Sequence, residues 1–266
     1  MKGPSTLEHA EDNWQTDIGA AFVGERVVYR GKDLFTELND ISWFKHFIFG
    51  ITNKMFADNE IKLMEKIWSL TMSYPDPRIW NNRIAALTAS ANSTGALAVS
   101  ASTACSEANV YGTKAGFLAI DFIKRALIVV DNNKDLAKFV LDELKENRSI
   151  PGFGRPVANS DERIIPLFNE AKKLGLANGP HTKLTFEIEK ILYESRYKLR
   201  MNAAGINSAL IADLGFTTRE QYYGIIIAFS SGILPCFIDA SNHKEGTFFP
   251  LPCGRLNYKG QRNRNW

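Results

Sequence analysis

The chain has 266 residues, which is enough for one large domain or two modest ones. Apolar residues make up 45% and charged residues 23%, as in a soluble globular protein, and the net charge of +3 gives no reason to expect nucleic acid as a partner. Three cysteines and four histidines without metal-ligand spacing argue against a disulfide framework and a metal site. The polar N-terminus lacks the apolar core of a secretory signal, so we expect a cytoplasmic location.

The predicted elements begin with a short β unit and continue as helices. Positions 25–31 are rich in β-branched residues and end in glycine, which predicts a short strand or one arm of a hairpin. Positions 58–70 repeat apolar residues at helical spacing, among them Ile61 and Trp68. Asp58 precedes this repeat and is expected to cap the helix.

Positions 84–106 carry no charged side chain and have the length of a membrane span. They consist mostly of alanine, serine, threonine and asparagine, with Gly95 among them, rather than the leucine, isoleucine and phenylalanine that favour lipid. Small residues let helices approach closely. The segment therefore predicts one or two buried helices at a packed interface.

Three further segments, 135–145, 184–199 and 225–238, show helical periodicity. The last of them is nearly all apolar, which predicts a central buried helix, bent near Pro235. Strand signals are scarce, so the sequence predicts an all-α protein.

The most informative segment is 148–163. Gly152 and Gly154 lie two residues apart, and glycine lets a backbone approach a flat ligand closely. Arg155 follows the second glycine, and Arg163 precedes a predicted helix. The segment resembles the P-G-(F/Y)-G-H-P…D-P-R signature of the citrate synthase and citryl-CoA lyase superfamily, whose loop cradles the adenine of coenzyme A. By that resemblance, the expected coenzyme A-binding residues are Ile150, Pro151, Gly152, Phe153 and Gly154.

Other motifs of the superfamily follow in the same order along almost the whole chain. Each is weak by itself, but together they make the resemblance fairly specific. They lie at 14–34, which resembles a short β unit and an R-G-Y-D-L helix start, at 110–117 (H-G-G-A-N-E), at 202–215 (N-V-D-x-x-S-G-A), at 228–232 (A-R-T-x-G) and at 256–260 (Y-x-G).

The resemblance implies a citrate-synthase-like all-α fold with a short N-terminal β hairpin. A large helical domain would comprise 1–115 and 222–266, and a smaller inserted helical domain would comprise 116–221, with ligand in the cleft between them. Superfamily members pair through helices of the large domain, so a homodimer is expected, with 84–106 at or near its seam. In that arrangement the partner's C-terminus completes each site.

The catalytic positions of the superfamily are occupied by different residues in this chain. The reaction uses a carboxylate that takes a proton from an acetyl thioester, one histidine that donates to the thioester oxygen, and a second that polarises the acceptor ketone. Carried over by position, these fall on Ala204, Tyr111 and Arg155. Alanine cannot accept a proton, so ordinary citrate synthesis by these residues is excluded.

The arginines of the superfamily are also exchanged. One falls on Phe229, and another falls near Cys253, with Arg255 close by, whereas Arg163 is kept. The expected substrate ligands are Arg163, Arg78, Asn202 and Arg255.

A redirected enzyme is the first interpretation of this exchange. Arg155 would stabilise an oxyanion with its fixed charge, Tyr111 would donate a hydrogen bond, and Asp76 would be a substitute base. The expected activity is carbon–carbon bond formation or cleavage on an acyl-CoA or carboxylic acid. A coenzyme A thioester would be the substrate, with no covalently bound cofactor, no metal, no nucleic acid and no membrane.

Two other interpretations remain open. The chain could be a catalytically inactive binding or regulatory subunit that pairs with an active relative. Alternatively, the motif register could be shifted, or the fold could host a cofactor-free isomerase or hydrolase. At single positions, Arg155 could form a structural ion pair with Asp161 or Glu162, Asp76 could be a turn and cap residue, and Tyr111 could fill a pocket at a helix start.

Overall fold

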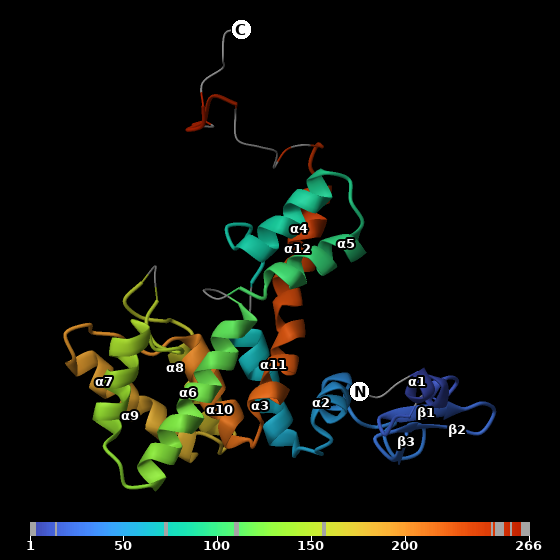
Figure 1. The fold of residues 1–266 in the computed structure, drawn as a ribbon, viewed down its shortest axis with the longest axis horizontal. Helices are drawn as coiled ribbons and strands as arrows, with labels where there is room; N and C mark the ends of the chain where they lie inside the picture. Colours follow the sequence, from blue (N-terminus) through green and yellow to red (C-terminus); the bar gives the residue numbers. More distant parts are fainter. Residues whose placement is uncertain are drawn as a thin grey trace.

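The computed structural model describes residues 4–13, 15–71, 74–108, 112–155, 158–245, 247, 253–255 and 257–261. Within these ranges the chain folds mainly into α-helices, with one small antiparallel sheet near the N-terminus (Figure 1). The predicted all-α fold with a short N-terminal β unit is therefore confirmed.

The N-terminal unit consists of one short helix and three short strands. The strands pair antiparallel in chain order, with Val28 of the middle strand opposite both Ala20 and Asp33. The strand predicted within 25–31 is confirmed, and a third strand extends the hairpin. The elements are α1 (Pro4–Ala10), β1 (Gly19–Phe22), β2 (Arg26–Tyr29) and β3 (Lys32–Asp33).

Two residues at the end of β2 attach this unit to α2 (Trp43–Thr52). The ring of Tyr29 stacks on His46 with centroids 4.5 Å apart. The Arg30 guanidinium donates two hydrogen bonds, of 3.1 and 2.8 Å, to the Gly50 carbonyl.

Helix α3 (Asp58–Thr71) confirms the helix predicted at 58–70. The expected capping role of Asp58 is wrong, because Asp58 is already helical and its carboxylate pairs with Lys45 at 2.8 Å. The start of the helix is held instead by Glu60, whose carboxylate accepts the N–H of Ala57 at 2.7 Å.

Helices α3 and α6–α10 share the largest hydrophobic core. The helix predicted at 135–145 is confirmed as α7, and Asp135 caps it by accepting the Lys138 N–H at 3.0 Å. The helix predicted at 184–199 starts earlier, at Pro180, and ends at Glu194. The bounds are α6 (Thr113–Asp131), α7 (Leu136–Asn147), α8 (Ile164–Lys173), α9 (Pro180–Glu194) and α10 (Ala203–Asp213).

A second helical body is formed by α4 (Trp80–Ser90), α5 (Gly95–Cys105) and α12 (Ser230–Ser241). The uncharged stretch at 84–106 thus forms most of two helices, as predicted. Its small side chains are buried on one side, where Ala85 lies against Ile233 and Cys236 of α12. In Figure 1 this body lies above α11, whereas the N-terminal unit lies to the right, beyond α2.

The two helical bodies are joined by one long apolar helical run, which comprises α11 (Thr218–Ile226), η1 (Ile227–Phe229) and α12. Among the described residues, this run at Thr218–Ser241 is long and apolar enough to cross a membrane, although core helices of soluble proteins meet the same criterion. In its most apolar window only 28% of the residues are buried within the chain.

The prediction of a central buried helix at 225–238 is therefore wrong for the single chain. Leu234 and Ile238 are 43% and 58% exposed. The departure from α-helical geometry lies at η1 rather than at Pro235, which lies inside α12. The hydroxyls of Ser230 and Ser231 donate to carbonyls within η1, so side chains compete there with the backbone hydrogen bonds.

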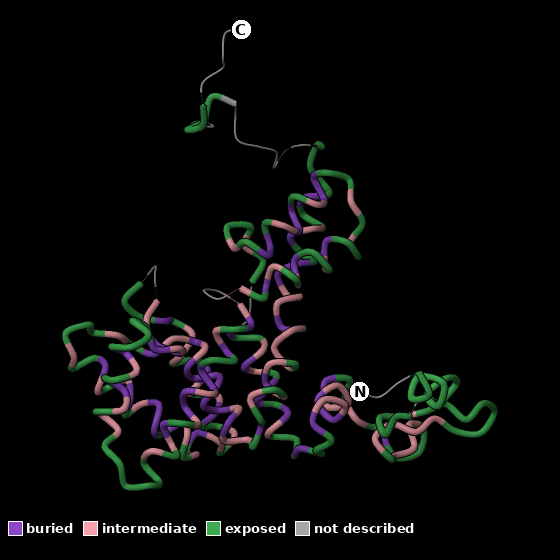
Figure 2. The backbone as a smooth tube through the Cα atoms, in the orientation of Figure 1, coloured by how far each residue is buried: buried purple, intermediate pink, exposed green. Residues whose placement is uncertain are grey.

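The predicted division into two domains remains a prediction. Buried residues concentrate in the body of α6–α10 and in a smaller group between α4 and α12, whereas the N-terminal unit is mostly exposed (Figure 2). Leu63 and Ile67 of α3 belong to the core of α6–α10 although the sequence assigned them to the other domain. Helix α3 thus packs on both sides of the expected boundary.

Candidate functional site

The glycine-bearing loop is held against the start of α10 by its backbone. Phe153 is buried and forms an isolated β-bridge with Met201. The Gly154 N–H donates to the Arg200 carbonyl at 2.7 Å, and the Asn202 N–H donates to the Gly152 carbonyl at 2.9 Å. These bonds place the predicted coenzyme A loop, with Ile150 and Phe153 buried and Pro151 partly buried, beside the N-terminus of a helix.

Glycine is required on both sides of this contact. Gly152 and Gly154 have φ values of +88° and +81°, in the left-handed region that favours glycine. A Cβ on Gly152 would lie 2.8 Å from the Cα of Gly205, and a Cβ on Gly205 would collide with the Gly152 carbonyl oxygen. The two glycines therefore allow loop and helix backbones to touch.

Asn202 uses its whole side chain to hold the loop to the helix. Its Oδ1 caps α10 by accepting the N–H groups of Ala204 at 2.9 Å and Gly205 at 3.3 Å. Its Nδ2 donates to the Gly154 carbonyl at 2.7 Å. Asn202 thus positions the site, and its predicted contact with substrate remains untested.

A buried carboxylate, Asp161, forms the centre of the charged part of the site. Its side chain is 1% exposed and accepts two bonds from Arg163, Nε to Oδ1 at 2.8 Å and Nη2 to Oδ2 at 2.7 Å. It also accepts the Ala203 N–H at 2.8 Å. Burial raises the pKa of Asp161, but these hydrogen bonds and the charge of Arg163 outweigh burial and hold the pKa below its usual range.

Arg163 also connects the site to α3, because its Nη1 donates to the Thr71 carbonyl at 3.0 Å.

Arg155 forms the structural ion pair that was one of the two interpretations of this residue. Its guanidinium binds both carboxylate oxygens of Glu162, and Nη1 lies 3.9 Å from Asp161 Oδ1. The hydrogen bond to Glu162 is the largest cause of its raised pKa.

Asp76 forms a turn with Arg78 at the start of α4. Its carboxylate accepts the Arg78 N–H at 2.9 Å and the Arg78 guanidinium, with Nη2 to Oδ2 at 2.6 Å. These hydrogen bonds lower the pKa of Asp76 to about 2, which makes it a weak base.

The remaining predicted residues are more dispersed. Tyr111 lies outside the described residues, just before α6. Ala204 is partly buried on the first turn of α10, and Phe229 lies in η1. Arg255 is exposed in η2 (Cys253–Arg255), on the C-terminal segment that projects beyond α12 in Figure 1. The structure thus unites Arg155, Arg163 and Asn202 with the loop, and it leaves Arg255 apart.

Sequence reasoning missed two buried polar residues behind the site. Thr71 donates to the Ile67 carbonyl at 2.6 Å and accepts Asn207 Nδ2 at 2.6 Å. Asn207 falls on the serine of the family motif at 202–215, and this polar side chain was the only sign in the sequence that the position matters.

Among the described residues, no group of three or more histidine, cysteine, aspartate or glutamate side chains could hold a metal ion.

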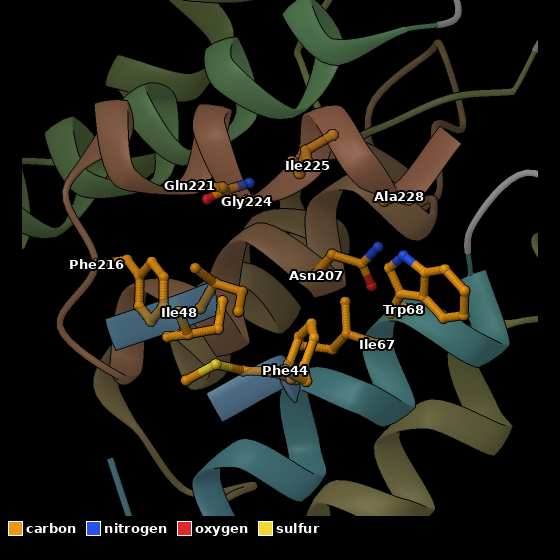
Figure 3. A pocket seen from close by; sticks show the side chains of 12 residues that line it. Phe44, Ile48, Ile67, Trp68, Asn207, Phe216, Gln221, Gly224, Ile225 and Ala228 are labelled. Atoms are coloured by element: carbon orange, nitrogen blue, oxygen red, sulfur yellow. The ribbon is translucent and has the colours of Figure 1, made fainter. Parts of the chain in front are cut away.

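Two hollows in the surface lie near these elements, and the loop at 150–155 lines neither of them. One lies between α2, α3, α10 and α11 and is lined mainly by apolar side chains (Figure 3). The other, about 520 Å³, is an open depression between α6 and α11 that Lys114, Arg219 and Tyr222 help to line.

Comparisons with solved structures agree with this architecture. Citryl-CoA lyase from Hydrogenobacter thermophilus superposes with a TM-score of 0.83 and 19% identity over 96% of this chain and 97% of that chain. ATP citrate lyase from Methanosaeta concilii gives a TM-score of 0.75 at 18% identity over 98% of this chain, which spans 45% of that longer protein. Citrate synthase from Thermotoga maritima gives 0.66 at 17% identity over 85% of this chain and 60% of that one.

No protein-family model matches the sequence, and no curated protein matches it. Identities below 20% show a shared fold and leave the chemistry of this chain open. The helical fold and the small N-terminal sheet are nevertheless those expected from the motifs. The chain has the citrate-synthase fold shared by citryl-CoA lyase, ATP citrate lyase and citrate synthase.

Proposed function

We propose that this chain is a member of the citrate synthase and citryl-CoA lyase superfamily that forms or cleaves a carbon–carbon bond of a coenzyme A thioester. The observation that carries the proposal is the glycine loop pressed onto the start of α10 beside Arg155 and Arg163. The solved ATP citrate lyases with this fold contain (3S)-citryl-CoA, or citrate and coenzyme A.

In this proposal the loop at 150–154 receives the adenine, and Arg163 binds a carboxylate of the substrate. Arg155 stabilises the oxygen that becomes negative when the bond at the α-carbon of the thioester forms or breaks. Tyr111 donates a hydrogen bond to the same intermediate. Asp76 is the weakest part of the assignment, because a carboxylate with a pKa of about 2 holds a proton poorly.

Calorimetry tests the ligand class directly. Coenzyme A, acetyl-CoA, citrate and oxaloacetate are titrated separately into the protein at millimolar concentration. Heat of binding with coenzyme A or a thioester is expected, because the loop and the charged cluster are preformed. The absence of binding heat with all four ligands would contradict the proposal.

Arg155 gives a sharper test once a turnover assay exists. Replacement of Arg155 by alanine is expected to lower kcat about 100- to 1,000-fold, because one oxyanion donor is typically worth about 3–4 kcal/mol. Glu162→Gln is the matched control, since it breaks the same ion pair and keeps the guanidinium. Equal rates for the two variants would show that Arg155 has only a structural role.

A second candidate function, that of an inactive partner subunit, is supported because the polar groups of the site already have partners within the chain. Asp76, Arg155 and Asn202 all have partners within the chain, and Ala204 has no acid–base group. An inactive subunit that pairs with an active relative would have these features. Co-purification with a complete citrate synthase, together with no thioester binding by the isolated chain, would favour this function.

We also propose that a second copy of the chain covers the apolar surface of α5 and α12. Leu97 is 61% exposed and Ile238 is 58% exposed on these helices. The single variants Leu97→Glu and Ile238→Glu are each expected to raise the dissociation constant of the dimer at least tenfold, because burying such an apolar side chain is worth about 1.5–3 kcal/mol. Sedimentation velocity measures the change, and Leu7→Glu in α1 is the control. A monomeric wild-type protein would refute the proposal.

A further inference from the structure

A small cavity lies between α10, α11, α3 and α2, one helical turn below the start of α10 (Figure 3). Its volume is about 60 Å³, which exceeds the space that one water molecule needs. The lining is mainly apolar. It comprises Phe44, Ile48, Met64, Ile67, Trp68, Asn207, Ile211, Phe216, Gln221, Gly224, Ile225 and Ala228.

Three polar atoms on this lining have no hydrogen-bond partner among the described residues, namely Asn207 Oδ1, Gln221 Oε1 and Trp68 Nε1. Asn207 is 9% exposed and Gln221 is 3% exposed. A buried polar group without a partner costs about 1–3 kcal/mol, so three of them around one cavity indicate that something polar occupies it.

The orientation of both amides is fixed by their other contacts. The Thr71 hydroxyl donates to the Ile67 carbonyl, so it can only accept from Asn207 Nδ2, and Asn207 Oδ1 is left over. Ser208 Oγ donates to the Gly116 carbonyl at 3.3 Å, so it accepts from Gln221 Nε2 at 2.8 Å, and Gln221 Oε1 is left over. Figure 3 shows Asn207 and Trp68 at one end of the cavity and Phe216 at the other.

The cavity lies on the face of α10 that also carries Ala204. Ala204 precedes Asn207 by three residues and therefore lies on the same face, one turn nearer the N-terminus of the helix. At that position a carboxylate would be expected by resemblance, and alanine leaves room in its place. A chain attached near Ala204 would thus point along α10 towards Asn207.

We propose that the cavity receives the acyl chain of the thioester, a short aliphatic group that carries a hydroxyl. The apolar walls suit the carbon chain. A hydroxyl can donate to Asn207 Oδ1 and accept from Trp68 Nε1 at once, which satisfies two of the three unpartnered atoms. This assignment rests on the proposed function, because it makes the cavity part of the substrate site.

The affinities of coenzyme A, acetyl-CoA, butyryl-CoA and 3-hydroxybutyryl-CoA test the proposal by calorimetry. Butyryl-CoA is expected to bind about tenfold more tightly than acetyl-CoA, because it buries two more methylene groups. 3-Hydroxybutyryl-CoA is expected to bind at least as tightly as butyryl-CoA. Trp68→Phe removes the indole donor together with part of the ring; the lost donor should weaken the hydroxylated ligand more than butyryl-CoA, which gains the same space. Trp43→Phe, whose indole is 68% exposed on α2, is the control.

Gly224→Leu provides a second variant, since a Cβ on Gly224 meets no atom within 4 Å and a longer side chain would fill the cavity. It should reduce the ratio of butyryl-CoA to acetyl-CoA affinity to about one. Equal affinities of all four ligands in the wild-type protein would overturn this inference and leave the proposed function standing. No binding of coenzyme A or any thioester would overturn both.

Discussion

Replacement of Asp161 by asparagine is expected to lower the free energy of unfolding by about 3–5 kcal/mol, as for other buried ion pairs that lose one partner. The carboxylate is 1% exposed, and it neutralises Arg163 while accepting the N–H at the start of α10. Asparagine keeps the size of the side chain, but it leaves a partly buried guanidinium without its counter-charge. Urea unfolding followed by circular dichroism measures the loss.

Glu162→Gln is the control for this prediction, because Glu162 is 67% exposed in its ion pair with Arg155. Exposed pairs contribute about 0–1 kcal/mol, so this variant should unfold close to the wild type. Equal losses in the free energy of unfolding for Asp161→Asn and Glu162→Gln would show that the burial of Asp161 does not increase its contribution to stability.

The loss at Asp161 should also depend on pH in a defined direction. Its pKa is lowered in the folded state, so its contribution is complete above the unfolded pKa of about 3.9. It disappears as the pH falls through the lower folded pKa. The difference in stability between wild type and Asp161→Asn should therefore be constant near neutrality and shrink below about pH 4. A difference that grows on acidification would contradict the assignment.

Local signals in the sequence predicted much of the fold. Helices α3 and α7 follow their apolar periodicity. The paired glycines at 152 and 154 were expected to approach a flat ligand, which stays a prediction, whereas the structure shows Gly152 against the backbone of Gly205 in α10. For the two helices the determining contacts lie within a few residues, where spacing and residue type decide the outcome.

What the sequence could not predict depends on contacts between distant segments. Trp68 lies on the apolar face of α3, so its pattern indicates core packing, and only the structure places its indole N–H on a cavity with Asn207. Asp58 matched a cap in sequence but meets Lys45 of α2 in space. The bond from Arg163 to Thr71 spans 92 positions, and no local pattern records it.

The same limit applies to the helical run that ends in α12. Its composition indicates burial, because an apolar helix must be covered by something. Within one chain the cover is incomplete, and Leu234 and Ile238 remain exposed. The composition of a helix indicates that it must be buried, but it does not indicate whether the surface that covers the helix belongs to the same molecule.

Gly205→Ala is expected to destabilise the protein by about 2 kcal/mol, although alanine favours a helix over glycine by about 1 kcal/mol. The added Cβ would collide with the Gly152 carbonyl oxygen and lie 3.2 Å from its carbonyl carbon, both of which belong to the backbone and cannot rotate away. Loop and helix must separate, which strains the bond from the Asn202 N–H to Gly152. Thermal and urea unfolding measure the effect.

Gly224→Ala makes the same chemical change in a helix without the collision, because a Cβ at Gly224 meets no atom within 4 Å. It should stabilise the protein by up to about 1 kcal/mol through helix propensity alone. The two substitutions should therefore have opposite signs, and the difference between them isolates the contact of the loop with α10. If coenzyme A binds at that contact, Gly205→Ala should also weaken its binding. Stability changes of the same sign for Gly205→Ala and Gly224→Ala would refute the close backbone approach on which the candidate site depends.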